Sequence, residues 1–177
     1  MFIIQALYFF LPAYVSNMTP VIFGRYNILQ KPIDFNKKVN NKPMLGAHKT
    51  WGGLLYGTIA GTAIFYVQQE LYSIPVFQSL SLFNYNQSPI ILGILLASGA
   101  LIGDAVKSFF KRRMNKNDGE AWFPFDQIDY VIGALVCAAP LYVPSLKIIM
   151  ALLVLAPFLH YAANHIAFFL RLKSVNW

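Results

Sequence analysis

Four residues of one segment have types and spacing that suit chemistry: Asp104, Lys107, Ser108 and Lys111. They fall at positions i, i+3, i+4 and i+7, so a helix would present all four on one face. The apolar segment that carries them begins near Pro89. Charged groups inside a membrane helix, or at its edge, are costly, so their presence there indicates a function. A carboxylate beside two ammonium groups and a hydroxyl suits a metal ion bound to a phosphate.

A second group of acids follows this segment. Asp126 and Asp129 lie at i and i+3 near the expected start of the next helix, on the same face as Gly133. Acids also stabilise a helix N-terminus by a few tenths to about one kcal/mol, which is the competing interpretation. Antiparallel neighbouring helices, however, would bring these acids to the same membrane edge as Asp104. Because Mg²⁺ prefers carboxylate oxygens shared with substrate phosphates, the three acids predict a magnesium site.

Basic and hydroxyl side chains near these acids are candidates for phosphate binding. Lys107, Lys111 and Arg112 supply cations that phosphate oxygens attract. Ser108 either donates a hydrogen bond to a phosphate or returns it to its own helix, and the sequence leaves both roles open.

Another candidate site precedes the second apolar segment. Gly46, Lys49 and Thr50 come just before a helix start, where backbone N–H groups can bind an anion. The stretch is not a Walker A loop, because the required glycine–lysine spacing is absent. Upstream of it, Asn40-Asn41 predicts a turn. Asn17, in the first apolar segment, either contacts this site or forms hydrogen bonds between helices.

The composition indicates a membrane protein. Of the 177 residues, 57% are apolar and only 12% are charged. Soluble domains carry about 25% charged residues. The seven acidic residues and three histidines are too few to cover a soluble surface. A single cysteine, Cys137, excludes an intramolecular disulfide.

The apolar segments predict an all-α integral membrane protein with one domain over residues 1–177. Five segments are readable, approximately Phe2–Phe23, Trp51–Val67, Pro89–Phe110, Asp126–Val143 and Ser145–Leu170. A membrane-spanning helix needs about 20 residues, so the second and fourth segments are near the short limit. Glycines recur four residues apart in the second and third segments, which favours close packing of helices.

Basic residues alternate between the connections. Those after the first and third segments are basic, whereas residues 68–88 contain no Lys or Arg. The positive-inside rule therefore predicts a multi-pass protein of the cell membrane, with its N-terminus outside and its C-terminus in the cytoplasm. The basic residues assigned to the cytoplasmic side are Arg25, Lys31, Lys37, Lys38, Lys42, Lys49, Lys107, Lys111, Arg112, Arg113, Lys116, Arg171 and Lys173. The net charge of +7 suits anionic lipid headgroups, and we expect no nucleic-acid partner.

Taken together, these stretches resemble the CDP-archaeol synthase family. That family is a compact branch of the CTP-transferase superfamily, which includes phosphatidate cytidylyltransferase. The resemblance covers nearly the whole chain. The stretches that carry it are Pro12–Pro20, Lys31–Asp34, Leu45–Gly53, Gly103–Arg113, Pro124–Tyr130 and Asn164–Leu170 with Trp177. The fourth and fifth of these match the superfamily signature region and are the specific part.

The resemblance implies an enzyme that joins CTP to a dialkylglycerol phosphate, giving a CDP-lipid and pyrophosphate at the cytoplasmic membrane edge. It implies Mg²⁺ on Asp104 and Asp126, with Asp129 binding the metal directly or supporting its ligands. The residues expected to neutralise the triphosphate are Lys107, Lys111 and Arg112. The residues expected around the nucleotide or lipid headgroup are Asn17, Gly46, Lys49 and Thr50.

Alternatives remain at this level. Phosphatidate enzymes carry Asp-Arg where this chain has Asp126-Gln127, which favours the archaeol-type branch and leaves the diacylglycerol phosphate enzyme as the alternative. A non-enzymatic, ion-coupled transporter of lipid or solute would use the same intramembrane acids without turning over CTP. An enzyme that consumes CDP-lipids does not fit, because Asp118-Gly119 lacks the Ala-Arg pair required after it. The sequence leaves the oligomeric state open, a homodimer included.

Overall fold

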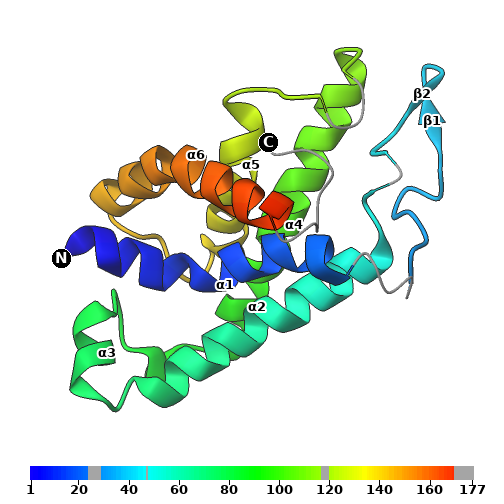
Figure 1. The fold of residues 1–177 in the computed structure, drawn as a ribbon. Helices are drawn as coiled ribbons and strands as arrows, with labels where there is room; N and C mark the ends of the chain where they lie inside the picture. Colours follow the sequence, from blue (N-terminus) through cyan, green and yellow to red (C-terminus); the bar gives the residue numbers. More distant parts are fainter. Residues whose placement is uncertain (24–28, 47, 117–119, 170–177) are drawn as a thin grey trace.

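The computed structural model describes residues 1–23, 29–46, 48–116 and 120–169. Its elements (Figure 1) are α1 (Phe2–Phe23), β1 (Lys38–Val39), β2 (Lys42–Pro43), α2 (Trp51–Leu71), α3 (Pro75–Leu80), the 3₁₀ turn η2 (Tyr85–Gln87), α4 (Ile90–Arg113), α5 (Phe125–Ala138) and α6 (Leu146–Phe169). Arg25, Asp118-Gly119, Arg171, Lys173 and Trp177, which entered the sequence predictions, lie outside the described residues.

The all-α membrane class predicted from the sequence is confirmed. In the described part of the chain, α1, α4 and α6 are long and apolar enough to cross a membrane. α5 has only 14 residues and ends at Ala138, earlier than the predicted Val143. Pro140 explains this end, because proline has no N–H to donate to the carbonyl oxygen four residues earlier and its ring clashes with that turn. α2 is longer than predicted, and its last turn is polar, with Gln68, Gln69 and Glu70.

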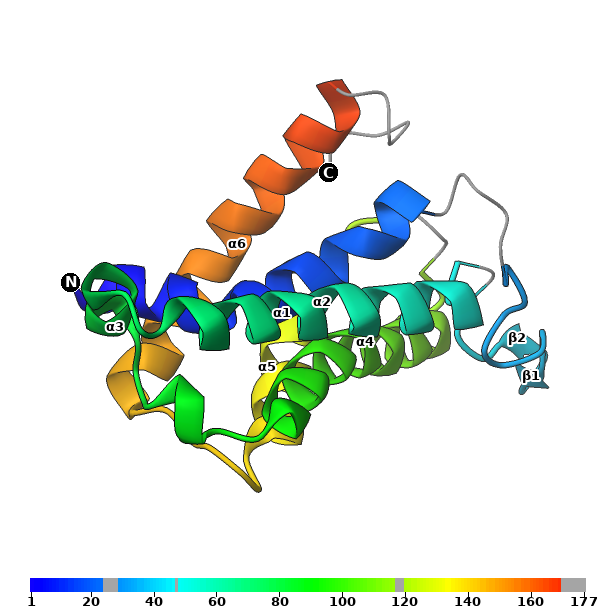
Figure 2. The ribbon, with the colours of Figure 1, turned by 90° about the horizontal axis from the view of Figure 1, so that it is seen from below.

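The helices form a bundle around α1, which contacts α2, α4, α5 and α6. Figure 2 shows α1, α2 and α4 side by side over much of their length, whereas α6 diverges from α1 toward its C-terminal end. α1 and α2 can approach closely because Gly61 faces α1. A Cβ on Gly61 would lie 2.5 Å from the carbonyl oxygen of Pro12. This observation supports the packing role predicted for the repeated glycines.

Aromatic rings fill the core at the end of the bundle near η2. Tyr85 is fully buried and stacks on Phe83, with ring centroids 4.4 Å apart. Phe83 in turn contacts Tyr142 at 4.6 Å. The Gln69 amide donates hydrogen bonds to the carbonyl oxygens of Tyr85 (3.1 Å) and Ser88 (2.8 Å), which ties the α3–α4 connection to α2. This end is therefore firmly packed, and the polar site lies at the other end of α4.

Large apolar side chains remain exposed on the outer faces of the bundle. Ile59, Val136, Val154 and Phe158 are each more than half exposed. A water-soluble surface rarely carries so extensive an apolar area, whereas lipid-facing helices require it.

Candidate active site

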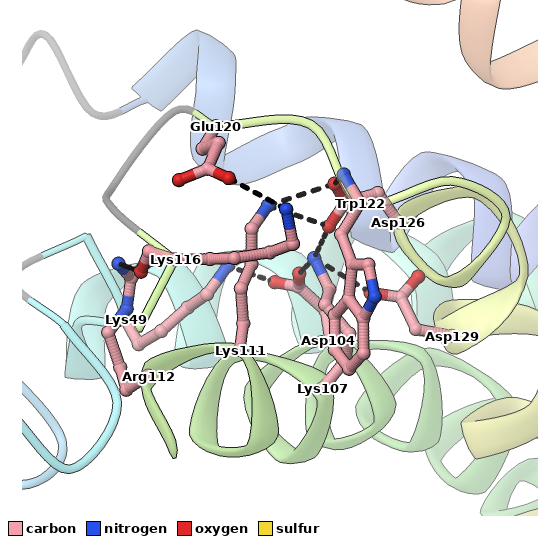
Figure 3. Close-up of polar contacts among 10 residues, drawn as sticks. All are labelled: Lys49, Asp104, Lys107, Lys111, Arg112, Lys116, Glu120, Trp122, Asp126 and Asp129. Carbon is pink, nitrogen blue, oxygen red and sulfur yellow. Dashed lines mark hydrogen bonds and ion pairs between the residues drawn. The ribbon is translucent and has the colours of Figure 1, made fainter. Parts of the chain in front are cut away.

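The candidate site lies where the C-terminal turns of α4 meet the first turns of α5. Lys49, which precedes the N-cap residue Thr50 of α2, reaches the same site. Figure 3 shows side chains from these three regions converging on one point. They border a cavity of about 1580 Å³. The cavity is bounded elsewhere by α1 and α6, so it connects a charged region with apolar helix faces.

Lys107 is the centre of the cluster. Its ammonium nitrogen lies 3.2 Å from Oδ1 of Asp104, 2.7 Å from Oδ1 of Asp126 and 3.1 Å from Oδ2 of Asp129. The Lys107 side chain is only 14% exposed. Three carboxylates from two helices thus share one partly buried cation.

Two further lysines complete the cluster. Lys49, from the connection before α2, forms an ion pair with Oδ2 of Asp104. Lys111, one turn after Lys107, donates to both oxygens of Asp126 at 3.0 and 2.9 Å. The backbone N–H of Trp122 also donates to Asp126, at 2.6 Å. The formal charges of the three acids and three lysines sum to zero, which lowers the cost of holding so many charges in a partly buried site.

Of the three acids, Asp129 alone has a buried side-chain oxygen that accepts no hydrogen bond from a described residue. Its Oδ1 accepts the N–H of Tyr130 at 2.6 Å, and its side chain is 6% exposed. Its Oδ2 has the ion pair with Lys107 but no hydrogen bond of good geometry from any described residue. This oxygen therefore has capacity for another positively charged partner.

The close approach of α4 and α5 is what brings the acids of both helices together. Gly103 and Gly133 face each other across the interface. A Cβ on Gly103 would lie 2.3 Å from the carbonyl oxygen of Asp129, and one on Gly133 would lie 2.3 Å from that of Gly99. Any side chain at either position would push the helices apart. The glycine spacing in the sequence indicated this packing, but not that it positions Asp129.

The first connection positions Lys49. The hairpin β1–β2 turns through Asn40 and Asn41, whose φ angles of 52° and 60° fit the two-residue turn that the sequence predicts. The hairpin lies against the end of α4, because the Arg113 guanidinium donates to the carbonyl oxygens of Val39 (2.5 Å) and Pro43 (2.6 Å). The charge pattern of the sequence places Arg113 only on the basic side of the membrane, and local spacing contains no signal for this long-range contact.

Hydrogen bonds between backbone groups hold the connection near Lys49 itself. The Ile33 N–H donates to the carbonyl oxygen of Lys49 at 2.8 Å, and Pro32 and Thr50 form a β-bridge. The Asp34 carboxylate accepts the N–H groups of Leu45 (2.8 Å) and Asn36 (3.0 Å). Lys49 therefore extends from a segment that hydrogen bonds hold in place.

All of the residues predicted for the site border the same cavity: Asn17, Gly46, Lys49, Thr50, Asp104, Lys107, Ser108, Lys111, Arg112, Asp126 and Asp129. Several of them also have structural roles. The Thr50 hydroxyl caps α2 by accepting the N–H of Gly53 at 3.1 Å. Gly46 has a φ of 103°, which side chains rarely allow. Arg112 donates to the carbonyl oxygen of Lys116 at 2.5 Å.

Other residues line the cavity although sequence reasoning assigned them no role in the site. Tyr14 and Tyr130 are among them and pack together with ring centroids 5.8 Å apart, and His160 of α6 is another. Aromatic residues are frequent in this chain, so no pattern in the sequence distinguishes these from the ones that only pack.

The carboxylates fit a divalent cation by type, but their present partners are lysines. Among the described residues, no three acidic, histidine or cysteine side chains are arranged to hold a metal ion as they stand. The Lys107 ammonium occupies the point on which Asp104, Asp126 and Asp129 converge, at 2.7–3.2 Å from one oxygen of each. Hard carboxylate oxygens are nevertheless the ligands that Mg²⁺ uses beside phosphates.

Comparison with known proteins identifies the family. The family model described as CarS-like CDP-archaeol synthase matches residues 1–177. The CDP-archaeol synthase of Pyrococcus furiosus is 38% identical over 99% of this chain and 98% of its own length. That of Methanococcus maripaludis is 40% identical over 98% and 96%. A solved intramembrane enzyme for archaeal membrane lipid biosynthesis superposes with a TM-score of 0.74 at 29% identity, covering 90% of this chain and 92% of its own. The chain therefore belongs to the CDP-archaeol synthase family.

Proposed function

We propose that this chain transfers the cytidylyl group of CTP to the phosphate of an archaeol-type dialkylglycerol, at the cytoplasmic edge of the cell membrane. CDP-lipid and pyrophosphate are the products. A CTP-dependent lipid cytidylyltransferase is what the family and the intramembrane structural relative support. The ether lipid, the metal ion and the roles of individual residues are the parts proposed here.

One observation carries the proposal: a single cavity joins a cluster of three acids and three lysines to apolar helix faces. Leu7, Leu11 and Met18 line it from α1, and Leu159 and Ile166 line it from α6. A triphosphate needs the charged region, whereas the chains of a lipid need the apolar one. Both substrates can therefore meet within one site.

The reaction requires positioning more than acid–base chemistry. A phosphate oxygen of the lipid attacks the α-phosphorus of CTP and forms a new P–O bond. The bond between the α-phosphorus and the bridging oxygen breaks, and pyrophosphate leaves with that electron pair. The attacking phosphate is already anionic, so no general base has to activate it. The main contributions are alignment of the reacting atoms and neutralisation of charge.

The residues of the cluster suit these two tasks. Lys49, Lys107 and Lys111 extend toward the cavity from two elements and can pair with triphosphate oxygens. Asp104, Asp126 and Asp129 would hold Mg²⁺, which when bound would neutralise charge on the phosphates. Gln127 follows Asp126, where phosphatidate enzymes carry arginine, and this supports the ether-lipid branch.

Turnover of labelled CTP by the purified chain tests the proposal, with Mg²⁺ and a panel of ether and ester lipid phosphates. We expect CDP-lipid from the ether substrates. Asp104→Asn and Asp126→Asn should each lose most turnover while remaining folded. Lys116→Met is the matched control, because Lys116 pairs with Glu120 (2.7 Å) outside the cluster. Product formed only from ester lipids would refute the ether assignment, and full turnover in both Asn variants would refute the site assignment.

A further inference from the structure

Lys107 lies where a cation bound by the three carboxylates would lie. Its Nζ is within 3.2 Å of Asp104, Asp126 and Asp129 simultaneously, and these acids come from two different helices. Such convergence of three carboxylates on one atom is unusual for a structural ion pair, which needs a single acid. The geometry is that of a cation site with an ammonium in it.

A metal ion and this ammonium cannot share the site. Mg²⁺ binds oxygen at about 2.0–2.1 Å, inside the volume that an ammonium 3 Å from the same oxygens occupies. The two cations would also repel each other strongly at that separation in a partly buried site. A metal ion can therefore use these carboxylates only after Lys107 has moved.

Lys107 borders a cavity in which its side chain has space to move and in which a bound anion would attract it. Lys107 lines the cavity together with Lys49 and Lys111, so its flexible side chain can turn toward a ligand placed there. A triphosphate would attract all three lysines. Their departure would leave three carboxylates without cationic partners in a partly buried site, and that state is costly unless another cation arrives.

We propose that Lys107 is an exchangeable counter-ion, which balances the carboxylates before substrate binds and passes to the triphosphate as a divalent cation takes its place. This inference rests on the proposed function, because it assumes that a metal and a nucleotide use this site. Metal and nucleotide then bind cooperatively: each makes the site available to the other. In the absence of nucleotide, Lys107 opposes metal binding, although it assists the reaction afterwards.

Binding of Mn²⁺ alone tests this opposition without any turnover. Free Mn²⁺ is measured by electron paramagnetic resonance, with the full-length protein in detergent and no nucleotide present. Lys107→Met should bind Mn²⁺ at least about tenfold more tightly than the wild type, because a competing charge some 3 Å away has been removed. Lys107→Arg keeps the charge and should bind as weakly as the wild type. Lys116→Met removes a charge outside the cluster and should also match the wild type.

Thermal unfolding provides the second readout, in case Lys107→Met is unstable. Loss of the ammonium shared by the three acids leaves Asp129 without a cationic partner, which should lower the unfolding midpoint of this variant. Mn²⁺ should restore the midpoint, since a ligand stabilises the folded state that binds it. A lysine with only a structural role would cause the loss without the rescue. Mn²⁺ affinity in Lys107→Met equal to or below that of the wild type, with no rescue, would overturn the inference. Because these measurements use no CTP, their failure can be distinguished from absence of cytidylyl transfer.

Discussion

Substitution of Gly133 by alanine should disable the site without changing any charged residue. The added Cβ would lie 2.3 Å from the carbonyl oxygen of Gly99 and 2.6 Å from Cα of Gly103. Both neighbours are backbone atoms, so neither can rotate away. An ordinary carbon–oxygen contact is about 3.3 Å, so α5 would have to retreat from α4 by about 1 Å.

This displacement of α5 would lengthen the ion pairs that join α4 to α5. A shift of about 1 Å would lengthen the Lys107–Asp129 pair from 3.1 Å toward the limit of an ion pair. Misplacement on that scale costs roughly 100-fold in rate when catalysis depends on alignment. Overpacking should also destabilise the fold by about 1–3 kcal/mol, partly offset by the better helix propensity of alanine, worth about 1 kcal/mol.

The assay compares kcat for CTP turnover and the thermal unfolding midpoint in detergent. Ile132→Ala is the matched control, because Ile132 precedes Gly133 on α5 and its side chain is 48% exposed on the outer face. We expect the control to retain wild-type kcat, and Gly133→Ala to lose about two orders of magnitude while still folding. Wild-type kcat and unfolding midpoint in Gly133→Ala would show that close packing of α4 and α5 does not position the acids.

Three other predictions follow from the same geometry. Arg113→Met should raise KM for CTP more than it lowers kcat, because the hairpin that braces Lys49 loses its contacts at Val39 and Pro43; unchanged KM would contradict this. Thr50→Ala should destabilise the protein by about 1 kcal/mol in unfolding experiments through loss of the α2 cap, whereas Thr50→Ser should retain it. Chelation of divalent cations should abolish turnover until Mg²⁺ is restored, yet leave the unfolding midpoint unchanged, because Lys107 already balances the acids; a large drop in the midpoint would argue against that balance.

Local spacing was sufficient to predict which residues of α4 lie together beside the cavity. Asp104, Lys107, Ser108 and Lys111 share a helix face because of the period of the helix, and all of them border the cavity. Helix ends were less accurately predicted. Hydropathy extended the fourth segment to Val143, but α5 ends earlier because Pro140 lacks the N–H that would continue the helix. A hydropathy average does not register such a local break.

Contacts between distant segments could not be predicted in this way. The pairing of Lys49 with Asp104, and of Arg113 with the hairpin, depends on how the first connection folds back onto α4. The position of Lys49 or Arg113 along the chain does not distinguish either residue from the other basic residues nearby.

The sequence by itself determined the membrane class and the acids and lysines available for chemistry, because composition and helical periodicity are local properties. Its motifs carried the resemblance to the family. Only the tertiary structure decided that Lys107 lies at the point where Asp104, Asp126 and Asp129 converge. That arrangement depends on the close contact of Gly103 with Gly133, which sets the separation of two helices. The physical reason is that a buried charge pairs with the opposite charge that helix packing places beside it. Helix packing depends on contacts throughout the bundle.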